Sequence, residues 1–472
     1  MESLWQSLTL GRLSIAQWQR SSWLHRSTVG SLEPWRRSSF WMQRGETLGA
    51  MLIVVILGLA PFVENSLTAV LLFASGALWV LLTLSDTPGK GFTPIHLLVA
   101  LYWGVNAIAT GLSPVKAAAA SGLIKFSLYL LLFLLAARVL RSPLLRNWVI
   151  TAYLLLTQLV SAYGIRQHFF GAKALATWVD PTSGQAATTR VYSYLGNPNL
   201  LAAYLIPGVA LSIAAFFVWR RLGPKCLAAF MFLTNSACLV LTYSRGGWIG
   251  MMLTLAMLAM CLLAWWSIKF NAFWRRWAIP VTLGAGTAFV VVAVVALEPL
   301  RSRVVSIFYG RGDSSNNFRL NVWASVIEMI KTRPVLGIGP GNQAFNAIYP
   351  LYQRPRFTAL SAYSIFLETL VETGVIGFAC FLWLLATVFG QGWRSLQQLR
   401  LEQNPQAYWL MSAIAILPGE LGQGLFDTVF YRPEVNTLWW LAIGLIASFY
   451  SPQHSTQAES AAALNAFEQP LP

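Results

Sequence analysis

Charged residues are scarce in this chain. They make up 11% of its 472 residues, against about 25% in soluble domains, while 56% of the residues are hydrophobic. This composition excludes an ordinary soluble domain and predicts an all-α polytopic membrane protein. Acidic residues are the scarcer kind, at 17 against 33 Lys and Arg. In a soluble protein that excess suggests nucleic acid, but Lys and Arg also collect in the cytoplasmic loops of membrane proteins, so we expect no nucleic-acid partner.

Cysteine is also rare, and no metal motif is present. The four cysteines lie in apolar runs without metal-ligand spacing, so we expect buried free thiols, no metal and no cofactor. No cleavable signal peptide is visible before residue 47, which predicts that the first span is an uncleaved anchor. The cytoplasmic N-terminal segment expected over residues 1–46 interleaves Arg with Trp. Such a composition is typical of a segment lying on an anionic membrane face, and a poorly ordered tail fits it equally well.

Long apolar runs are what the chain has in abundance. A helix needs roughly 20 mostly apolar residues to cross a bilayer. About twelve runs of that kind are present, and we expect transmembrane helices over residues 47–63, 66–85, 93–112, 117–138, 146–164, 197–218, 225–243, 247–267, 278–297, 361–389, 407–425 and 436–450. They form a transmembrane domain of residues 47–450, which a short polar tail of residues 451–472 follows.

The short connections between these runs predict the orientation of the chain. Those expected on one side carry most of the basic residues, namely Lys90, Arg138, Arg141, Arg146, Arg220, Arg221, Lys225, Lys269, Arg275, Arg276, Arg394 and Arg400. Those expected on the other side carry only Lys116, Arg245 and Arg432. Because cytoplasmic connections are enriched in Lys and Arg, we expect both termini in the cytoplasm and two long loops, about 165–196 and 298–360, outside.

The loop over residues 298–360 is the longest interruption between apolar runs, and it is strongly basic. Three acids accompany eight basic residues: Arg301, Arg303, Arg311, Arg319, Lys331, Arg333, Arg354 and Arg356. The spacing of Arg319, Trp323 and Ile327 predicts an amphipathic helix over about 317–331, one of the short helices expected in this extracytoplasmic loop. A basic loop held between spans predicts an anion-binding site. The guanidinium of Arg319 suits a phosphate or carbonate there, or else reaches toward lipid headgroups.

Other polar residues at the expected outer ends of spans are candidates to complete this site. Arg245 lies in a very tight turn beside the basic loop. Asn199 follows Pro198 at the start of a span, where helix capping alone also accounts for it. The glycine-rich stretch 337–342 lacks the Lys-Ser/Thr of a nucleotide-binding loop. It predicts a structural turn, or a turn that presents its amides to an anion beside Arg333 and Asn342.

Four ionisable residues lie within expected spans, where charge is costly and usually faces a cavity or a partner. Glu368 and Glu372 are one helical turn apart on the same face of the tenth span. They are expected to support the site or to form ion pairs with arginines of the loop. Lys125 and Glu420 lie deeper within their spans, and we expect each to be functional or paired.

The ordered set of motifs over about residues 190–380 resembles the O-antigen ligase and polymerase superfamily of bacterial inner-membrane proteins. The resemblance rests on residues 196–199, Ser244-Arg245-Gly246, Arg319 with Trp323, the stretch 333–342, and the Glu368 helix with Gly374 and Gly377. Across nearly the whole chain the sequence looks closest to a cyanobacterial branch, the inorganic-carbon (bicarbonate) transporter proteins. Residues 192–199 and 313–319 carry that closer likeness.

The resemblance implies two functions of different classes. One is an inner-membrane protein that binds or moves an inorganic anion such as bicarbonate, and the closer whole-chain likeness favours it. The other is a ligase that transfers a glycan from a polyprenyl-diphosphate lipid, with Arg245 and Arg319 holding the diphosphate. In the ligases a histidine at the start of the tenth span is the base, and Tyr363 occupies that position here. Tyrosine, with an unperturbed pKa of about 10, is a poor base near neutral pH.

Overall fold

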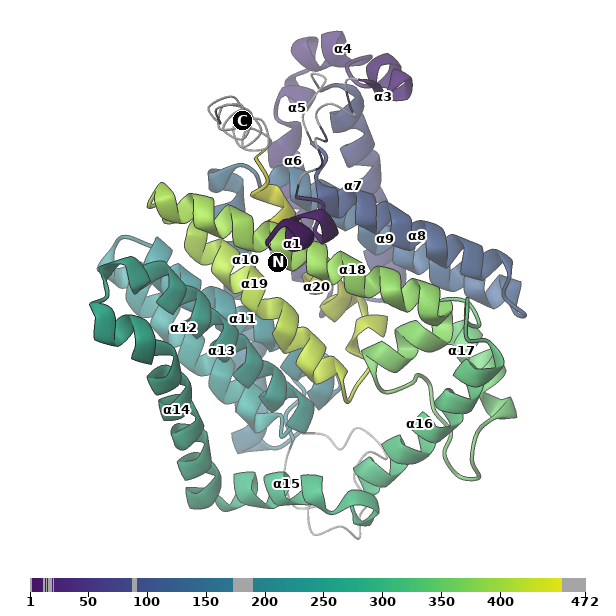
Figure 1. Cartoon of the computed structure of the whole chain (residues 1–472), viewed down its shortest axis with the longest axis vertical. Helices are drawn as coiled ribbons and strands as arrows, with labels where there is room; N and C mark the ends of the chain where they lie inside the picture. The colour runs from purple at the N-terminus through teal and green to yellow at the C-terminus, as the bar shows by residue number, and fades with distance from the viewer. Residues whose placement is uncertain are drawn as a thin grey trace, which may run out of the picture.

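The computed structural model describes residues 2–11, 13, 15, 19, 21–86, 91–172 and 190–451. Within these residues the chain forms helices and no strand (Figure 1). The α-helices are α1 (Glu2–Leu8), α3 (Trp23–Thr28), α4 (Glu33–Ser38), α5 (Phe40–Gln43), α6 (Gly45–Leu59), α7 (Asn65–Leu84), α8 (Pro94–Gly111), α9 (Lys116–Val139), α10 (Pro143–Phe170), α11 (Pro198–Val218), α12 (Leu222–Leu241), α13 (Arg245–Trp266), α14 (Ala272–Ala296), α15 (Glu298–Phe308), α16 (Ser314–Thr332), α17 (Asn342–Ile348), α18 (Ile365–Leu401), α19 (Ala407–Gly424) and α20 (Pro433–Ser448). Short 3₁₀ turns are η1 (Ser267–Lys269), η2 (Gly310–Gly312), η3 (Tyr349–Leu351) and η4 (Val429–Tyr431).

The prediction of an all-α polytopic membrane protein is confirmed. Among the described residues, nine helices are long and apolar enough to cross a membrane: α7 to α14 and α18. The other three expected spans coincide with α6, α19 and α20, which are shorter or more polar. The expected tail, residues 451–472, lies outside the described residues apart from Ser451.

The connections between the helices alternate between two ends of the bundle, as the basic-residue pattern predicts. At one end, the Arg400 guanidinium in α18 donates to Ser267 Oγ, at 2.8 Å, across the α13–α14 connection. At the other end, Arg333 Nη1 donates to the Leu112 carbonyl, at 3.1 Å, beside the α8–α9 connection. Helices α15 and α16 lie at the end opposite α3, α4 and α5 (Figure 1). Which end faces the outside stays a prediction.

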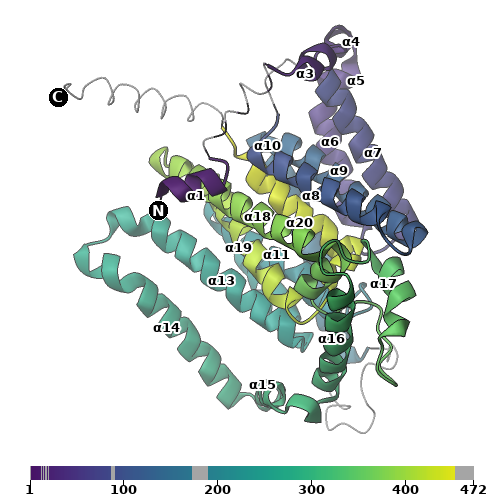
Figure 2. The same ribbon diagram turned by 45° about the vertical axis from the view of Figure 1, so that its right-hand side comes forward.

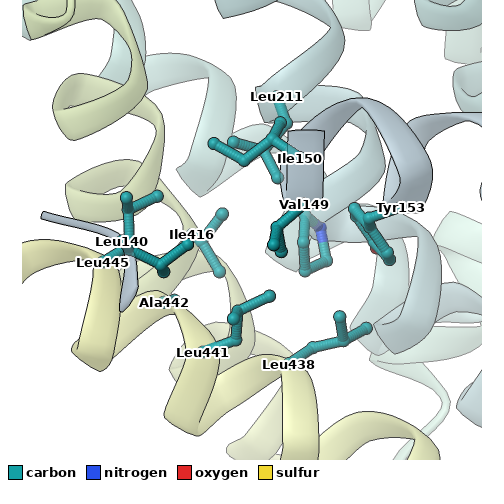
Figure 3. Close-up of a pocket in the computed structure, with 11 residues that line it drawn as sticks. Leu140, Val149, Ile150, Tyr153, Leu211, Ile416, Leu438, Leu441, Ala442 and Leu445 are labelled. Carbon is teal, nitrogen blue, oxygen red and sulfur yellow. The ribbon is translucent and has the colours of Figure 1, made fainter. Parts of the chain in front are cut away.

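The core lies where α9, α11, α19 and α20 pack together. Helix α11 is the most deeply buried of the nine candidate spans, because it is surrounded by α10, α12, α13 and α19. Of its apolar stretch of 18 residues, 78% is buried inside the protein. An apolar pocket lies between α10, α11, α19 and α20 (Figure 3). Its lining includes Tyr153, Leu211, Ile416 and Leu438. Apolar walls of this kind offer no group that could hold an anion, so the pocket is not the predicted site.

Helix α14 stands apart from this core. Only 6% of its apolar stretch of 18 residues is buried inside the protein. Figure 2 shows α14 and α15 as an arm separated from the main bundle. An apolar helix this exposed matches a hydrocarbon surrounding, because lipid tails are as apolar as its side chains. The arm carries the chain from α13 to α16, and it brings α15 to the end of the bundle where α11 and α13 begin.

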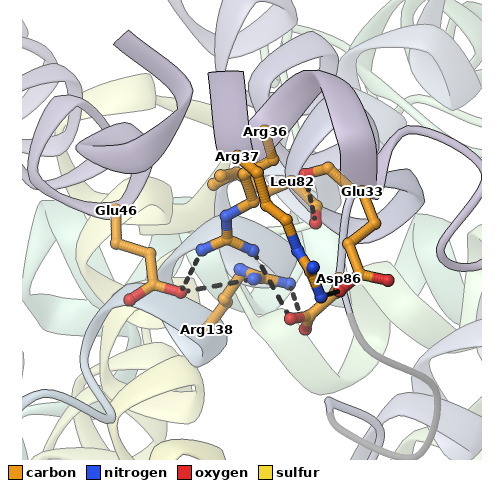
Figure 4. A network of polar contacts seen from close by, with 8 residues as sticks. Glu33, Arg36, Arg37, Glu46, Leu82, Asp86 and Arg138 are labelled. Atoms are coloured by element: carbon orange, nitrogen blue, oxygen red, sulfur yellow. Dashed lines mark hydrogen bonds and ion pairs between the residues drawn. The ribbon is translucent and has the colours of Figure 1, made fainter. Parts of the chain in front are cut away.

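The N-terminal segment is held to the opposite end by ion pairs. Arg36 and Arg138 each contact both Glu46 and Asp86, at N–O distances of 3.1–3.6 Å (Figure 4). These contacts join α4, the start of α6, the end of α7 and the end of α9. Arg36 is therefore paired with carboxylates of the bundle, and these pairs hold α4 against it.

Helix α18 is broken inside the bundle, and the break holds the glycine-rich stretch. Gly374 has φ 65° and ψ −168°, and an added Cβ would lie 2.2 Å from the Val335 carbonyl carbon. The Val375 amide donates to the Pro334 carbonyl, at 2.8 Å, and the Ile338 amide donates to the Val371 carbonyl, at 2.9 Å. Residues 334–341 therefore take up backbone groups that the break frees, which confirms the structural-turn interpretation of this stretch. The sequence predicts an unbroken span ending at 389, whereas α18 extends to Leu401 because its later turns pack against α1 and α20.

Candidate functional site

Four arginines from distant parts of the chain gather at the end of the bundle where α11, α13 and α16 begin. They are Arg190, Arg245, Arg303 and Arg319, hereafter the arginine cluster. The guanidinium of Arg190 interacts electrostatically with the other three, and that of Arg303 interacts with Arg245. Asp313 and Asp427 are the carboxylates that interact with the cluster. With four guanidiniums facing two carboxylates, the cluster carries an excess of positive charge.

Arg245 is the first residue of α13, where Ser244 caps the helix by accepting a hydrogen bond from the Gly247 amide. Its guanidinium donates to Asp313 Oδ1, at 3.0 Å, and to Ser306 Oγ, at 3.1 Å. Asp313 also caps α16, since its Oδ1 accepts from the Asn316 amide at 2.8 Å. One carboxylate therefore fixes the start of α16 against the start of α13. The pairing joins the tight turn to the basic loop, as the sequence predicts.

Arg319 lies one turn into α16, a helix that confirms the amphipathic segment expected over about 317–331. Its Nε donates to the Phe426 carbonyl, at 2.6 Å, and its Nη1 donates to Ser315 Oγ. Burial, and then the neighbouring guanidinium of Arg245, lower the pKa of Arg319, while Asp427 raises it. The contacts turn Arg319 toward the α19–α20 connection, so they favour the site over the lipid headgroups.

Arg190 and Asp427 are joined by Asn199. The Arg190 guanidinium donates to Asn199 Oδ1, at 3.1 Å, and Asn199 Nδ2 donates to Asp427 Oδ2, at 2.7 Å. The cap of α11 is Asn197, whose Oδ1 accepts from the Asn199 amide at 2.8 Å. The Asn199 side chain is therefore free of capping and serves as a bridge between a guanidinium and a carboxylate. The capping interpretation holds for Asn197 and not for Asn199.

Burial changes the acidity of groups at this site. Burial raises the pKa of Asp427, although Arg319, Asn199 and Arg190 all oppose the shift. Burial, and then the Asp427 and Tyr431 neighbours, raise the pKa of Tyr363 to about 12, although Arg319 opposes the shift. A phenol of that pKa is almost wholly protonated near neutrality. The structure therefore gives Tyr363 no activation as a base.

Tyr363 is positioned by packing. Its backbone has φ 51°, its carbonyl accepts from Trp323 Nε1 at 3.4 Å, and its ring meets Phe318 edge-on with centroids 5.3 Å apart. A left-handed backbone at a bulky residue is unusual and costs about 1–3 kcal/mol. The aromatic neighbours and the turn into α18 hold this conformation beside the arginine cluster.

The two carboxyls of α18 bind backbone amides instead of arginines. Glu368 Oε2 accepts from the Ala362 amide at 2.6 Å, and Glu372 Oε1 accepts from the Gly341 amide at 2.7 Å. The expected ion pairs with loop arginines are wrong, because the folded-back stretches 334–341 and 360–364 place amide donors nearer to both carboxyls. Asn342 acts in the same region, where its Nδ2 donates to the Leu360 carbonyl at 3.1 Å. Glu368 therefore holds the stretch that carries Tyr363, and Glu372 holds the glycine-rich stretch.

Two other predicted residues lie away from the arginine cluster. Arg333 is at the far end of α16 from Arg319, roughly 21 Å along the helix axis at 1.5 Å per residue. There it donates to the Leu112 carbonyl, at 3.1 Å. Lys125 is exposed on α9 and makes no hydrogen bond among the described residues. Neither side chain is brought to the site that the other arginines form.

Sequence reasoning missed three members of the site: Arg190, Arg303 and Asp427. Arg303 was within the basic loop, but nothing in the spacing distinguishes it from its neighbours. Asp427 had a signal, since it is an acid in a short polar connection between two apolar runs. Arg190 ends a long loop, and only the fold shows that it reaches the Thr242 carbonyl, at 3.0 Å, in the α12–α13 turn.

The fold and the site together define a polytopic membrane protein with a buried, positively charged cluster at one end of its helix bundle. Residues 228–382 match the family model described as O-Antigen ligase, which supports a place in the O-antigen ligase-like superfamily. The matched residues include Arg245, Arg303, Arg319 and Tyr363, whereas Arg190 and Asp427 lie outside them. No curated protein matches the chain.

Proposed function

We propose that this protein is an O-antigen ligase-like membrane protein whose arginine cluster binds the diphosphate of a polyprenyl-diphosphate-linked glycan. The observation that carries the proposal is the gathering of four arginines against two carboxylates at one end of the bundle. The family match over residues 228–382 supports the same class of substrate. The location proposed for the site is the outer face of an inner membrane, with both termini in the cytoplasm.

A diphosphate suits this cluster better than a monovalent anion does. Guanidiniums bind phosphate oxygens through paired, charge-assisted hydrogen bonds, and a diphosphate offers enough oxygens and charge for several of them at once. Arg245 and Arg319 are held by Asp313 and a backbone carbonyl in the described state. Binding exchanges some of these internal contacts for contacts to phosphate. Helix α14, whose apolar surface is exposed, leads into α15, which carries Arg303, and that surface suits a polyprenyl chain.

Transfer of the glycan needs a proton acceptor, and Asp427 suits that role better than Tyr363. In the step proposed, an acceptor hydroxyl forms a bond to the sugar carbon that carries the diphosphate. The bond from that carbon to the diphosphate oxygen breaks, the hydroxyl proton passes to the Asp427 carboxylate, and the polyprenyl diphosphate leaves. The raised pKa of Asp427 strengthens it as a base once it is ionised, and the arginines stabilise the charge of the leaving group.

The test of this proposal compares two anions on the purified full-length protein. Calorimetry with inorganic pyrophosphate and with bicarbonate should show binding of pyrophosphate at far lower concentrations. In liposomes that contain a polyprenyl-diphosphate glycan and an acceptor glycolipid, the protein should release polyprenyl diphosphate. Tighter binding of bicarbonate together with no release would overturn the proposal.

A second candidate function is the binding or movement of bicarbonate. Tyr363, a poor base at the position where the ligases carry histidine, favours it, and so does the whole-chain resemblance to the inorganic-carbon branch. Sealed proteoliposomes that contain only this protein should then take up labelled bicarbonate faster than empty vesicles. Equal uptake by both kinds of vesicle would exclude transport by the protein alone.

A further inference from the structure

Glu420 is a buried acid that the arginine cluster does not use. It lies near the C-terminal end of α19, with 1% of its surface exposed, in a helix that packs against α11, α13, α18 and α20. Ile416, one helical turn earlier, lines the apolar pocket of Figure 3 together with Tyr153. The carboxyl therefore lies inside the helix bundle, where an ionised group without a partner is strongly disfavoured.

Neither carboxyl oxygen of Glu420 has a hydrogen-bond partner among the described residues. Gln423, one turn further along α19, has an unpartnered Oε1 as well, while its Nε2 donates to the Asn199 carbonyl at 2.6 Å. Residues three apart on a helix are neighbours on its surface. Three acceptor oxygens thus lie within one turn of a buried helix, and no donor from the described part of the chain serves them.

Among the residues that the structure describes, no cation forms an ion pair with Glu420. The ionisable groups on the helices packed against α19, together with those on α10, are Arg146, Tyr153, Tyr163, Arg166, His168, Tyr204, Arg245, Cys261, Glu368, Glu372, Cys380, Arg394, Arg400 and Glu434. Arg245 pairs with Asp313, and no ion pair reaches Glu420 within the described ranges. The Tyr153 hydroxyl interacts electrostatically with Glu420, but it donates its proton to the Tyr204 carbonyl, at 2.7 Å.

We propose that Glu420 is a proton-binding site within the membrane-spanning bundle. A proton on the carboxyl removes the uncompensated charge and supplies a donor, for which Gln423 Oε1 is the neighbouring acceptor. A metal cation would need several more oxygen or nitrogen ligands, and no group of three such acidic, His or Cys side chains occurs in the described residues. A proton is therefore the cation that this site fits.

The position of Glu420 connects it to the candidate site. Gln423 holds the Asn199 carbonyl, and the Asn199 side chain holds Asp427, at 2.7 Å. Loss of the proton would place a negative charge one helical turn from this chain of hydrogen bonds. The proposed proton site is inferred from the burial of Glu420 and from its lack of hydrogen-bond donors among the described residues. The inference therefore does not depend on which anion the arginine cluster binds.

Infrared difference spectra test the proposal on the full-length protein. Glu420→Gln keeps the shape of the side chain and removes its titration. The spectrum of the wild type minus that of Glu420→Gln, both at neutral pH, should show the carbonyl band of a protonated carboxylic acid. This band should not change when sodium chloride replaces choline chloride. The matched control is Glu402→Gln, at an exposed residue of the α18–α19 connection, which should show carboxylate bands instead. Carboxylate bands for Glu420, or loss of the acid band with sodium, would overturn the proposal.

A second measurement uses the wild type alone and so does not depend on how the variant folds. Dicyclohexylcarbodiimide is an apolar reagent that modifies protonated carboxyls. At neutral pH the peptide containing Glu420 should gain the mass of the carbodiimide adduct. As the pH rises and the carboxyl ionises, labelling should fall about tenfold per pH unit. Absence of label at every pH, or label that does not change with pH, would contradict a proton site.

Discussion

Under the proposed function, Arg245 is the residue on which we expect anion binding to depend most. It contacts Asp313 and Ser306, at 3.0 and 3.1 Å, and so lies at the junction of α13, α15 and α16. Hydrogen bonds to charged groups contribute about 1.5–3 kcal/mol. We therefore expect Arg245→Ala to weaken pyrophosphate binding by about tenfold to a hundredfold, measured by calorimetry.

Two variants control this measurement. Arg245→Lys should restore only part of the affinity, because an ammonium lacks the planar fork of a guanidinium. Arg333→Ala removes a positive charge from the other end of α16 and should leave pyrophosphate affinity almost unchanged. Equal losses in Arg245→Ala and Arg333→Ala would mean that only the overall charge of the loop matters.

Substitutions at Tyr363 and at Asp427 are expected to have opposite effects on glycan transfer. Tyr363→Phe removes only a hydroxyl whose pKa is raised to about 12, so transfer should remain within a few-fold of the wild type. Asp427→Asn should abolish transfer while pyrophosphate still binds. Because burial raises the pKa of Asp427, its ionised form predominates only above the usual aspartate range, and the transfer rate should rise with pH through that raised pKa. If Tyr363→Phe abolished transfer and Asp427→Asn did not, then Tyr363 and not Asp427 would be the proton acceptor.

At the scale of elements, the break in α18 determines how residues 334–341 pack against the bundle. Gly374 combines a positive φ with backbone contact, since an added Cβ would lie 2.2 Å from Val335 backbone atoms. A substitution there must strain the backbone, by about 1–3 kcal/mol, and also displace residues 334–341. Gly374→Ala should therefore lower the thermal unfolding temperature of the purified protein and its level in the membrane.

Gly284→Ala in α14 is the matched control for that substitution. An added Cβ at Gly284 meets no atom within 4 Å, and alanine is the better helix former by about 1 kcal/mol. This variant should unfold at the wild-type temperature or above it. Comparable unfolding temperatures for Gly374→Ala and the wild type would show that the broken helix is not needed.

How well the sequence predicted an element depended on whether its signal was local. The apolar runs predicted the positions of the nine candidate spans among the described residues, and also those of α6, α19 and α20, because each run carries its own length and composition. Apolar length did not predict the break at Gly374, which exists because residues 334–341 insert against α18 from elsewhere in the chain. Motif order likewise indicated Arg245, Arg319 and Asn199, whereas Arg190 and Asp427 join them only through hydrogen bonds between distant segments.

For the whole molecule, the arrangement of connections predicts which residues share a face of the membrane. Ser314, at the start of α16, and Glu402, in the α18–α19 connection, lie at opposite ends of the bundle. In a background without native cysteines, Ser314→Cys should react with an impermeant maleimide in intact cells, and Glu402→Cys should react only after the cells are opened. The reverse pattern would place the arginine cluster in the cytoplasm, where the proposed outer-face reaction could not occur.

The most direct test of the central proposal is to measure the retention of polyprenyl diphosphate by the purified protein in native mass spectrometry. The wild type and Arg333→Ala should keep this lipid and release the matching polyprenyl monophosphate more readily. The double variant Arg245→Ala with Arg319→Ala should lose it while keeping ordinary phospholipids. Equal retention of the diphosphate lipid by the wild type and the double variant would contradict the account.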